Sequence, residues 1–338
     1  MQIAIVVFLL SFGCTAWFSS RFKPFGVLDA PNERSLHVMP TPRTGGIAIV
    51  VSLIIGIGYL WVRHATPWPL AIGCAAALLV SVISLLDDIY TLTPWIRLAV
   101  QVLAAVFAIG AGVSLSSIHL PGISQHLPYV LAGACTFIFL VWMTNLYNFM
   151  DGMDGFAGGM AVVGFSVLGY LGLRADDIGY AGVCFSVATA SAGFLVFNFP
   201  PARIFMGDTG SSTLGYMVGI LGIWADKDNI APLWVTMLVF SPFIVDATVT
   251  LVRRLLAGEK VWQAHRSHYY QRLVQAGWGH RRVVLCEYLV MLAAAGSAIL
   301  AVHYSKELVQ WSVLLVWAAI YIALAWSVDR IWRASLAK

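Results

Sequence analysis

The sequence predicts an all-α integral membrane protein with about eleven transmembrane helices, and three observations predict this fold class. Hydrophobic residues make up 60% of the 338-residue chain. Charged residues make up only 11% of it, whereas soluble domains carry roughly 25%. Several apolar stretches also exceed the roughly 18 to 20 residues that cross a bilayer core of about 30 Å. A water-soluble fold could not bury so much apolar surface, so the bilayer is the solvent of this chain.

The apolar stretches give the order and bounds of the expected helices. The first stretch has no basic residues before it and no small-residue cleavage site, so we expect an anchor and not a signal peptide. The five cysteines lie singly in separate helices without metal-ligand spacing, as small apolar residues do. No repeat or linker divides the chain, so residues 1–338 are predicted to form a single polytopic domain. The expected helices cover residues 2–20, 45–63, 69–86, 96–115, 128–146, 157–173, 179–197, 210–225, 231–254, 283–302 and 310–328.

Lysine and arginine lie mostly on one side of the predicted bundle. Sixteen of the twenty fall in the odd-numbered connections, the adjoining helix ends and the C-terminal tail, and the other four are Arg63, Arg174, Lys227 and Lys306. The positive-inside rule therefore places the odd connections and the C-terminus in the cytoplasm and the N-terminus outside. This topology, with attraction to anionic lipid heads, accounts for the net charge of +4, so no nucleic-acid partner is predicted.

Five polar clusters fall in the connections that the charge rule assigns to the cytoplasm. The outer connections are short or unremarkable by comparison. One-sided clustering argues against a transporter, which is expected to place polar groups near the bilayer midplane, often on broken helices, and to have related halves. The clusters are Asp29–His37 with Thr41–Gly46, Leu86–Leu92, Asn145–Gly155, Asn198–Ser211 and His265–Arg272.

Each cluster taken alone also has an ordinary structural explanation. Asp87 and Asp88 could be solvated residues at a helix end, although the helix macrodipole disfavours acids at a C-terminus. The glycine-rich segment 151–155 fits a turn, and it does not fit a calcium loop. Asp208 fits the N-cap of the helix that follows it. His265 and His268 could be interfacial histidines that are solvated by water. Arg34, His37 and Arg43 could serve only as topological signals.

Taken together, the clusters indicate Mg²⁺-assisted phosphoryl chemistry in catalytic loops on the cytoplasmic side. Carboxylates and carboxamides from three connections face arginine and histidine from two others. Hard oxygen ligands hold the metal, the metal bridges phosphate oxygens, and cations take up the remaining negative charge. Arg34, His37 and Arg43 are candidate phosphate-binding residues on this interpretation.

In combination and order, these motifs resemble the polyprenyl-phosphate N-acetylhexosamine-1-phosphate transferase superfamily, also called glycosyltransferase family 4. The resemblance covers about residues 27–282, and its motifs are Pro40–Gly46, Asp87-Asp88, Asn145–Gly155, Pro200–Ser211 and the segment 265–272. It implies a multi-pass enzyme of the bacterial inner membrane with a periplasmic N-terminus. It further implies transfer of an N-acetylsugar 1-phosphate from a UDP-sugar to undecaprenyl phosphate, with release of UMP.

The resemblance also implies roles for individual residues. Asp208 matches the Mg²⁺-binding aspartate of the family, with Asn148 and Asp151 close to the metal and Mn²⁺ as a substitute ion. Asp87 and Asp88 match the catalytic pair beside the metal and the lipid phosphate. The positions expected to bind the nucleotide sugar are Asp154 and Asn198, which match contacts to uracil, and Arg266 and His268, which match a diphosphate-binding loop.

One segment departs from the family pattern. Relatives commonly have several histidines where this chain has Tyr269, Tyr270 and Gln271, so it is more similar to the branch that initiates O-antigen or another surface glycan. The sugar donor and the oligomeric state, including a homodimer, stay open. Two alternatives also stay open: an enzyme similar to the CDP-alcohol phosphotransferases, whose Asp-Gly-x-x-Ala-Arg signature is absent here, and a lipid-linked-sugar transporter or flippase.

Overall fold

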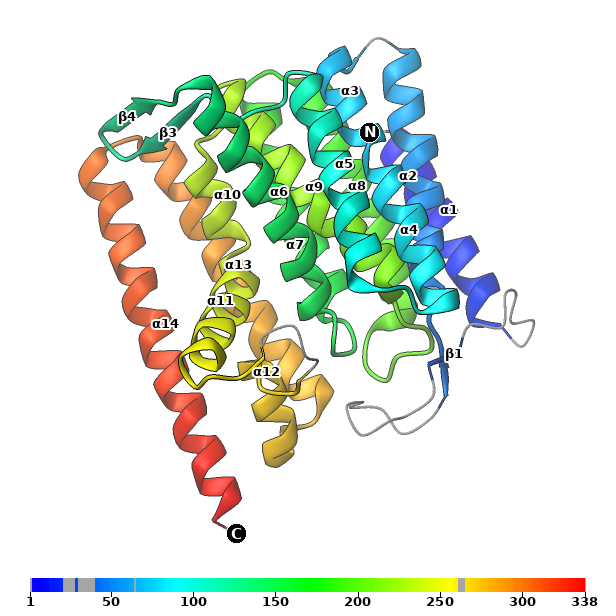
Figure 1. Cartoon of the computed structure of the whole chain (residues 1–338), viewed down its shortest axis with the longest axis vertical. Helices are drawn as coiled ribbons and strands as arrows, with labels where there is room; N and C mark the ends of the chain where they lie inside the picture. The colour runs from blue at the N-terminus through cyan, green and yellow to red at the C-terminus, as the bar shows by residue number, and fades with distance from the viewer. Residues whose placement is uncertain (1, 21–27, 30–39, 64, 261–264, 338) are drawn as a thin grey trace.

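The computed structural model describes residues 2–20, 28–29, 40–63, 65–260 and 265–337, and the described chain is a bundle of long helices (Figure 1). Helices suit these apolar runs because all their backbone hydrogen bonds close within the segment. The helices are α1 Gln2–Ser19, α2 Gly45–Val62, α3 Trp68–Ala75, α4 Ala77–Tyr90, α5 Pro94–Gly110, α6 Tyr129–Met150, α7 Phe156–Arg174, α8 Ile178–Asn198, α9 Gly207–Lys227, α10 Leu233–Val239, α11 Ser241–Leu256, α12 Tyr269–Leu273, α13 His280–Tyr304 and α14 Glu307–Leu336.

Eight helical segments of the described chain are long and apolar enough to span a membrane, counting α3 with α4 as one. The bent pair α10–α11 raises the number to nine, and α5 is a shorter apolar helix. Each predicted range overlaps a helix of the structure. The all-α membrane fold is therefore confirmed, whereas the count of eleven spans is not.

Several predicted helix ends were wrong, and two of these errors affect the polar clusters. Helix α4 continues to Tyr90 and α6 continues to Met150. Asp87, Asp88, Asn145 and Asn148 therefore lie on the last turns of helices and not in loops. The apolar pattern stops where these polar residues begin, but the helix continues because other helices supply their partners.

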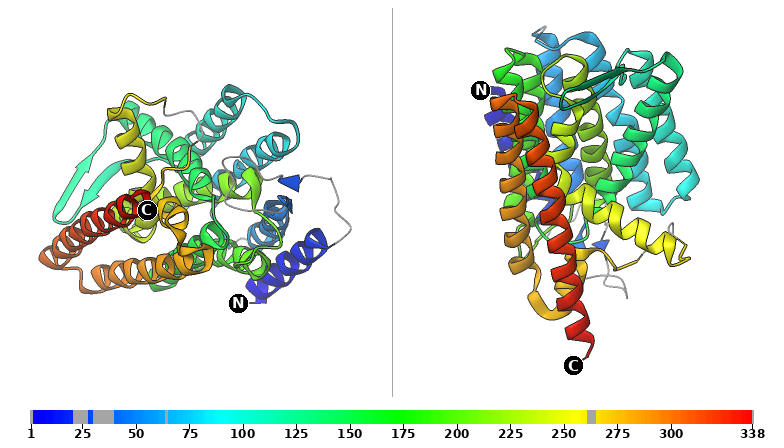
Figure 2. Two further views of the ribbon diagram at one scale, coloured as in Figure 1. Left: turned by 90° about the horizontal axis from the view of Figure 1, so that it is seen from below. Right: turned by 90° about the vertical axis from the view of Figure 1, so that its left-hand side faces the viewer.

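The predicted helix over residues 231–254 is also wrong as a single element. Helices α10 and α11 meet at an angle of 83°. Pro242 stands in the first turn of α11, where its missing N–H costs nothing and its fixed φ suits a helix start. Helix α11 consequently lies obliquely to the other helices (Figure 2). Phe240, the residue at the break, has a fully buried side chain.

Helix α9 packs against α2, α4, α6 and α10 and is buried along nearly its whole length. A side chain on Gly46 of α2 would collide with the backbone of Gly210 on α9. These two glycines thus let the backbones of α2 and α9 touch. The contact places the first turn of α9 beside the segment that precedes α2.

Two short hairpins complete the fold. Strands β1 Leu28–Asp29 and β2 Thr41–Pro42 pair near the start of α2, and strands β3 Ser117–Leu120 and β4 Ile123–His126 pair between α5 and α6. The second hairpin lies at the end of the bundle opposite the C-terminus (Figure 1). This hairpin was not predicted, because the outer connections are short or unremarkable in sequence.

The described N- and C-terminal helices begin and end at opposite ends of the bundle, and the polar connections gather at the C-terminal end (Figure 1). This arrangement agrees with the predicted one-sidedness. Which end faces the cytoplasm stays a prediction from the distribution of basic residues.

Cysteine labelling of intact cells tests this orientation. In a background without native cysteines, S35C and S267C should resist a membrane-impermeant maleimide, because both positions are predicted to be cytoplasmic. S124C, on the exposed strand β4 at the other end, is the matched control and should be labelled. Strong labelling at 35 and 267 with none at 124 would invert the assignment.

Candidate active site

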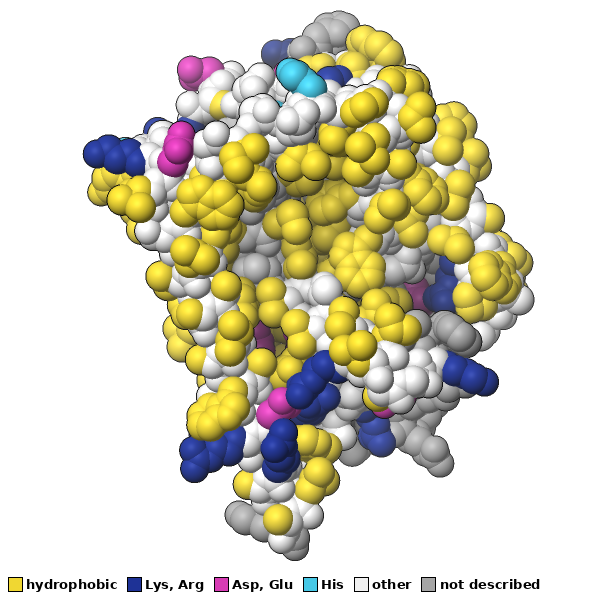
Figure 3. All heavy atoms as spheres, turned by 60° about the vertical axis from the view of Figure 1, so that its left-hand side comes forward, with side chains coloured by type: hydrophobic (Ala, Val, Ile, Leu, Met, Phe, Trp, Pro, Cys, Tyr) yellow, Lys and Arg dark blue, Asp and Glu magenta, His cyan; other side chains and the backbone are white. Residues whose placement is uncertain are grey.

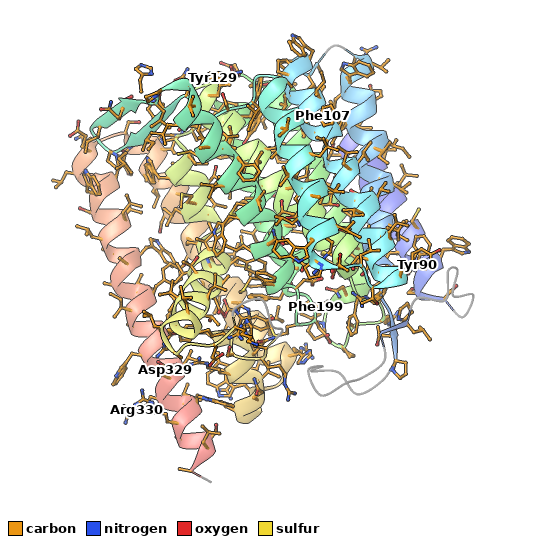
Figure 4. All side chains as sticks on the ribbon, viewed as in Figure 1. Tyr90, Phe107, Tyr129, Phe199, Asp329 and Arg330 are labelled. Atoms are coloured by element: carbon orange, nitrogen blue, oxygen red, sulfur yellow. The ribbon has the colours of Figure 1, made fainter. Side chains whose placement is uncertain are left out.

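The candidate site lies where the ends of α4, α5, α6 and α9 meet, at the lower end of the bundle in Figure 1. In Figure 4, the labelled Tyr90 and Phe199 lie at this end, and Phe107 lies farther along α5 toward the opposite end. The side chains of the Asp87-Asp88 pair, Asp208 and two arginines converge there.

Asp88 binds the first turn of α9. Its carboxylate oxygens accept hydrogen bonds from the backbone N–H groups of Asp208 and Thr209, both at 3.0 Å, and from the Thr209 hydroxyl at 2.7 Å. The Asp88 side chain is only 1% exposed. Asp88 is therefore not a solvated residue at a helix end. It caps a different helix, whose first N–H groups have no partner within the helix.

Asp208 is not an N-cap. The N-cap position of α9 is Met206, and Asp208 lies within the first turn. Its two carboxylate oxygens face two guanidinium groups: Arg43 Nη2 at 3.4 Å and Arg97 Nη1 at 3.1 Å. Because Asp88 supplies the cap, the Asp208 carboxylate is left to interact with cations.

The two arginines also bind the aspartate pair. Arg43 Nη2 lies 2.8 Å from Asp88 Oδ1, and Arg97 Nη1 lies 2.8 Å from Asp87 Oδ2. The backbone N–H of Leu92 donates to the other oxygen of Asp87 at 2.6 Å. Three carboxylates and two guanidinium groups thus form one continuous network across α4, α5, α9 and the segment before α2.

Arg97 was not predicted as a site residue, because in the sequence it is one of many basic residues on the predicted cytoplasmic side. Its position did carry a signal. The macrodipole disfavours a cation in the first turn of α5 and an anion in the last turn of α4. The sequence places Arg97 and Asp87 at these two unfavourable positions, ten residues apart, and in the structure they are partners.

Asn148 and Asp151 lie on the α6 side of the site. Asn148 Nδ2 donates to Ser211 Oγ on α9 at 2.9 Å, which leaves its amide oxygen as a further acceptor. Asp151 follows the last residue of α6. Desolvation, reinforced by the nearby negative charge of Asp208 and opposed by Arg43, raises the pKa of the Asp151 carboxyl to about 8. Two carboxyl groups close enough to perturb one another are a favourable setting for a cation.

These oxygen donors fit a magnesium ion that completes its coordination with substrate and water. Within the described ranges, no three His, Cys, Asp or Glu side chains are arranged to hold a metal by themselves. Mg²⁺ does not need such a cage, because it is usually bound by one or two carboxylates, several waters and substrate phosphates. Asp208, Asp151 and the Asn148 amide oxygen supply that kind of donor set.

Asp154 and Asn198 connect two loops of the site. Asp154 accepts a hydrogen bond from the backbone N–H of Ala202 at 3.0 Å and lies 3.2 Å from His280 Nδ1. Asn198 accepts from the N–H of Gly155 and donates to a backbone carbonyl of the 199–206 segment, both at 2.9 Å. Asn198 is 4% exposed and uses both ends of its amide in this way. The structure assigns it a bracing role, and contact with uracil stays a prediction.

The His-Arg segment is described from residue 265 onward. Arg266 is exposed, whereas His268 is buried and its Nδ1 lies 3.1 Å from Asp246 Oδ1 on α11. Desolvation and the neighbouring His268 lower the pKa of His265 to about 4, so His265 is neutral near pH 7. The predicted phosphate-binding residues Arg34 and His37 lie outside the described residues.

Positive charge gathers around this end of the molecule. Asp329 on α14 forms ion pairs with Arg253 and Arg272, each at 2.7 Å. Figure 3 shows Lys and Arg side chains near the lower end of a largely hydrophobic face. A basic rim beside an apolar face suits an amphiphile with an anionic head.

Comparisons with known proteins agree with this picture. The sequence pattern described as glycosyl transferase family 4 matches residues 70–226. A probable undecaprenyl-phosphate N-acetylglucosaminyl 1-phosphate transferase of Bacillus subtilis is 30% identical over 277 residues, which cover 81% of this chain and 77% of the relative. A decaprenyl-phosphate N-acetylglucosaminephosphotransferase of Mycolicibacterium smegmatis is 32% identical, with 88% and 80% covered. An undecaprenyl-phosphate alpha-N-acetylglucosaminyl 1-phosphate transferase of Escherichia coli K12 is 26% identical, with 93% and 86% covered.

The matched pattern contains the aspartate pair, both asparagines of α6 and Asp208, and the similarity to the relatives extends over most of the chain. The chain therefore belongs to glycosyl transferase family 4, within the superfamily of polyprenyl-phosphate N-acetylhexosamine-1-phosphate transferases.

Proposed function

We propose that this membrane enzyme transfers an N-acetylsugar 1-phosphate from a UDP-sugar to undecaprenyl phosphate in the bacterial inner membrane. The network of three carboxylates and two arginines at one end of the bundle is the observation that carries the proposal. It offers cations to phosphates and hard oxygens to Mg²⁺ at the boundary where a lipid phosphate lies. The product would initiate an O-antigen or another surface glycan.

The proposed reaction is a direct displacement at phosphorus. An oxygen of the lipid phosphate attacks the β-phosphorus of the UDP-sugar and forms a new P–O bond. The bond from that phosphorus to the bridging oxygen breaks, and UMP leaves with the electron pair. The lipid phosphate is already largely ionised near pH 7, since its second pKa is about 6, so the reaction does not require a general base.

The hydrogen bonds of Asp88 support a positioning role. Its oxygens already accept from Asp208, Thr209 and Arg43, so it is poorly placed to accept a proton from a substrate. Asp87 is similarly bonded to Leu92 and Arg97. We infer that the pair holds α9 and the two guanidinium groups in place, while the guanidinium groups bind phosphate oxygens.

Asp208, Asp151 and Asn148 are the residues proposed to hold Mg²⁺, with Mn²⁺ as a substitute. The bound ion would neutralise charge on the phosphates during transfer. Asp151 is suited to this role because desolvation and like charge make its isolated anion unfavourable. A divalent cation would relieve that cost by pairing with the ionised carboxylate.

Turnover by the purified protein tests the proposed function. The assay would supply undecaprenyl phosphate, Mg²⁺ and a panel of UDP-N-acetylsugars, with UMP release and mass spectrometry of the lipid product as readouts. One donor should give undecaprenyl-diphospho-sugar and equimolar UMP. A phospho-aspartate trapped in a single turnover would exclude direct attack. No turnover with any donor would overturn the proposal and favour the transporter.

The diphosphate role of the His-Arg segment predicts a specific kinetic change. Arg266→Lys keeps the charge but loses the forked guanidinium that can bind two phosphate oxygens. We expect the donor KM of Arg266→Lys, and of His268→Ala, to rise about tenfold, equivalent to about 1.4 kcal/mol. The KM for undecaprenyl phosphate should stay within about twofold, a change of less than half a kcal/mol.

Arg281→Lys is the matched control, because Arg281 is another exposed arginine at the start of α13. It should leave both KM values unchanged. Wild-type donor kinetics in Arg266→Lys would mean that Arg266 is only one more basic residue of the cytoplasmic side.

A further inference from the structure

A single carboxylate on α11 binds the beginning of α12. Asp246 Oδ1 accepts from His268 Nδ1 at 3.1 Å and from the Tyr269 N–H at 3.0 Å, and its Oδ2 accepts from the Tyr270 N–H at 3.1 Å. The hydroxyl of Thr250 donates to Oδ1 at 3.1 Å. Asp246 is 9% exposed, so these bonds lie largely out of water. Three of the four donors belong to one three-residue stretch.

Helix α12 depends on such an external acceptor. It has only five residues, and the first N–H groups of a helix have no acceptor within it. Within the segment, Gln271 Oε1 accepts from the His268 N–H at 3.2 Å as part of a capping box. That bond leaves the next two N–H groups unpaired, and Asp246 binds both. A negative charge at this position also interacts favourably with the helix macrodipole.

Helix α12 also contacts the acidic loop of the active site. The fully buried ring of Tyr270 lies 4.8 Å from the ring of Phe156. Its hydroxyl lies so close to Gly152 that a side chain there would collide with it. Gly152 follows Asp151 directly. Asp246, α12 and the Asp151 loop therefore form one packed series.

We propose that Asp246 is a positioning residue that fixes the His-Arg segment, residues 265–272, for binding of the donor diphosphate. Because a carboxylate only accepts hydrogen bonds, the bond to Asp246 favours the tautomer of His268 with a proton on Nδ1. Arg266 lies two residues before His268 and depends on the same anchor. This inference rests on the proposed function, since it assumes that the segment binds the donor.

The structure also contains a matched control for a purely structural carboxylate. Asp226, at the opposite end of the bundle, accepts from the Leu233 N–H at 2.8 Å and lies 3.0 Å from His119 Nδ1. It is 5% exposed. Like Asp246, it joins a histidine to the start of a helix, but far from the site. Any effect of losing such an anchor on general stability should appear in both positions.

Steady-state kinetics of Asp246→Asn test the proposal, with UDP-N-acetylglucosamine as the donor probe. An asparagine amide cannot accept hydrogen bonds at both former oxygens, so at least one α12 donor loses its partner. The donor KM should rise at least about tenfold, while the KM for undecaprenyl phosphate stays within about twofold. Asp226→Asn should leave both values unchanged. An equal rise of both KM values, or an unchanged donor KM, would overturn the proposal.

A double variant distinguishes action of Asp246 through His268 from a direct contact between Asp246 and the donor. If Asp246 acts through the segment, the double variant Asp246→Asn/His268→Ala should have a donor KM close to that of the single variant with the higher donor KM. Asp246→Glu should recover part of the loss, because it restores the anionic acceptor. Multiplied effects in the double variant would contradict action through His268.

Hydrogen–deuterium exchange of the purified protein without substrate keeps this test independent of turnover. In Asp246→Asn, amides of residues 269–278 should exchange at least about tenfold faster, because their anchor is weakened. Asp226→Asn should leave that segment unchanged. If no donor is turned over, faster exchange still supports the anchor while the proposed function fails. Unchanged exchange over 269–278 in Asp246→Asn would overturn the anchor whatever the turnover shows.

Discussion

Replacing Asp208 with asparagine should lower kcat by at least about a thousandfold, equivalent to about 4 kcal/mol of transition-state stabilisation. The carboxylate lies between Arg43 and Arg97 and is the central candidate ligand of Mg²⁺. A neutral amide is a weaker ligand for a hard cation, and it leaves both guanidinium groups without their shared partner. The fold should persist, because the N-terminal N–H groups of α9 are capped by Asp88 and not by Asp208.

Three measurements on purified protein check this expectation: kcat at saturating substrates, the melting temperature, and the change in melting temperature with added Mg²⁺. Mg²⁺ should raise the melting temperature of the wild type, since a ligand that binds only the folded state stabilises it. It should have little effect on Asp208→Asn. Removal of Mg²⁺ by a chelator should abolish wild-type turnover, and added Mg²⁺ should restore it.

Asp177→Asn is the control for an ordinary capping aspartate. Asp177 is the N-cap of α8 and accepts from the Tyr180 N–H at 2.8 Å. Asparagine caps helices about as well as aspartate, so this variant should keep nearly full activity. If Asp208→Asn also kept its activity within about threefold, or ~0.7 kcal/mol, Asp208 would be neither a metal ligand nor a catalytic residue.

The membrane fold could be predicted because the bilayer imposes a strong local rule. A long apolar segment must satisfy its own backbone, so hydropathy alone indicates the helices. The same rule fails at helix ends. Asp87 and Asn148 interrupt the apolar pattern, yet both remain helical because Arg97 and Ser211 bond to them from other helices. Partners more than a few residues away leave no trace in a local pattern.

The geometry of the site could not be predicted, because it depends on contacts between residues that are far apart in the sequence. The motif around Asp208 predicts a metal ligand, and this role stays a prediction. The motif gives no sign of the cap that Asp88 provides, because Asp88 is 120 residues away in sequence. Asp246 was missed although a charged residue within an apolar segment is by itself a reason to expect function. The bend at Pro242 was missed for a different reason: transmembrane helices tolerate an interior proline, so Pro242 alone did not divide the apolar run 231–254.

Asp88→Asn should reduce both stability and turnover, in contrast to Asp87→Asn. The buried carboxylate of Asp88 accepts from two N–H groups and one hydroxyl of α9, and an amide cannot accept all three in the same geometry. A buried donor left without a partner costs about 1–3 kcal/mol. Arg43 also loses its ion pair at 2.8 Å. The first turn of α9, which carries Asp208, should therefore shift, and kcat should fall by about a hundredfold or more, since each tenfold costs 1.36 kcal/mol.

The comparison with Asp87→Asn decides between positioning and proton transfer. Asp87 holds Arg97 and one loop N–H but no group of α9, so its loss should lower kcat with a smaller change in melting temperature. If either aspartate were instead a general base, its asparagine variant would melt like the wild type and lose the limb of the pH–rate profile that reports the base. Because Asp88 is fully engaged by donors, we expect Asp88→Asn to melt at a clearly lower temperature. A wild-type melting temperature together with abolished turnover in Asp88→Asn would contradict the positioning role and favour proton abstraction by this residue.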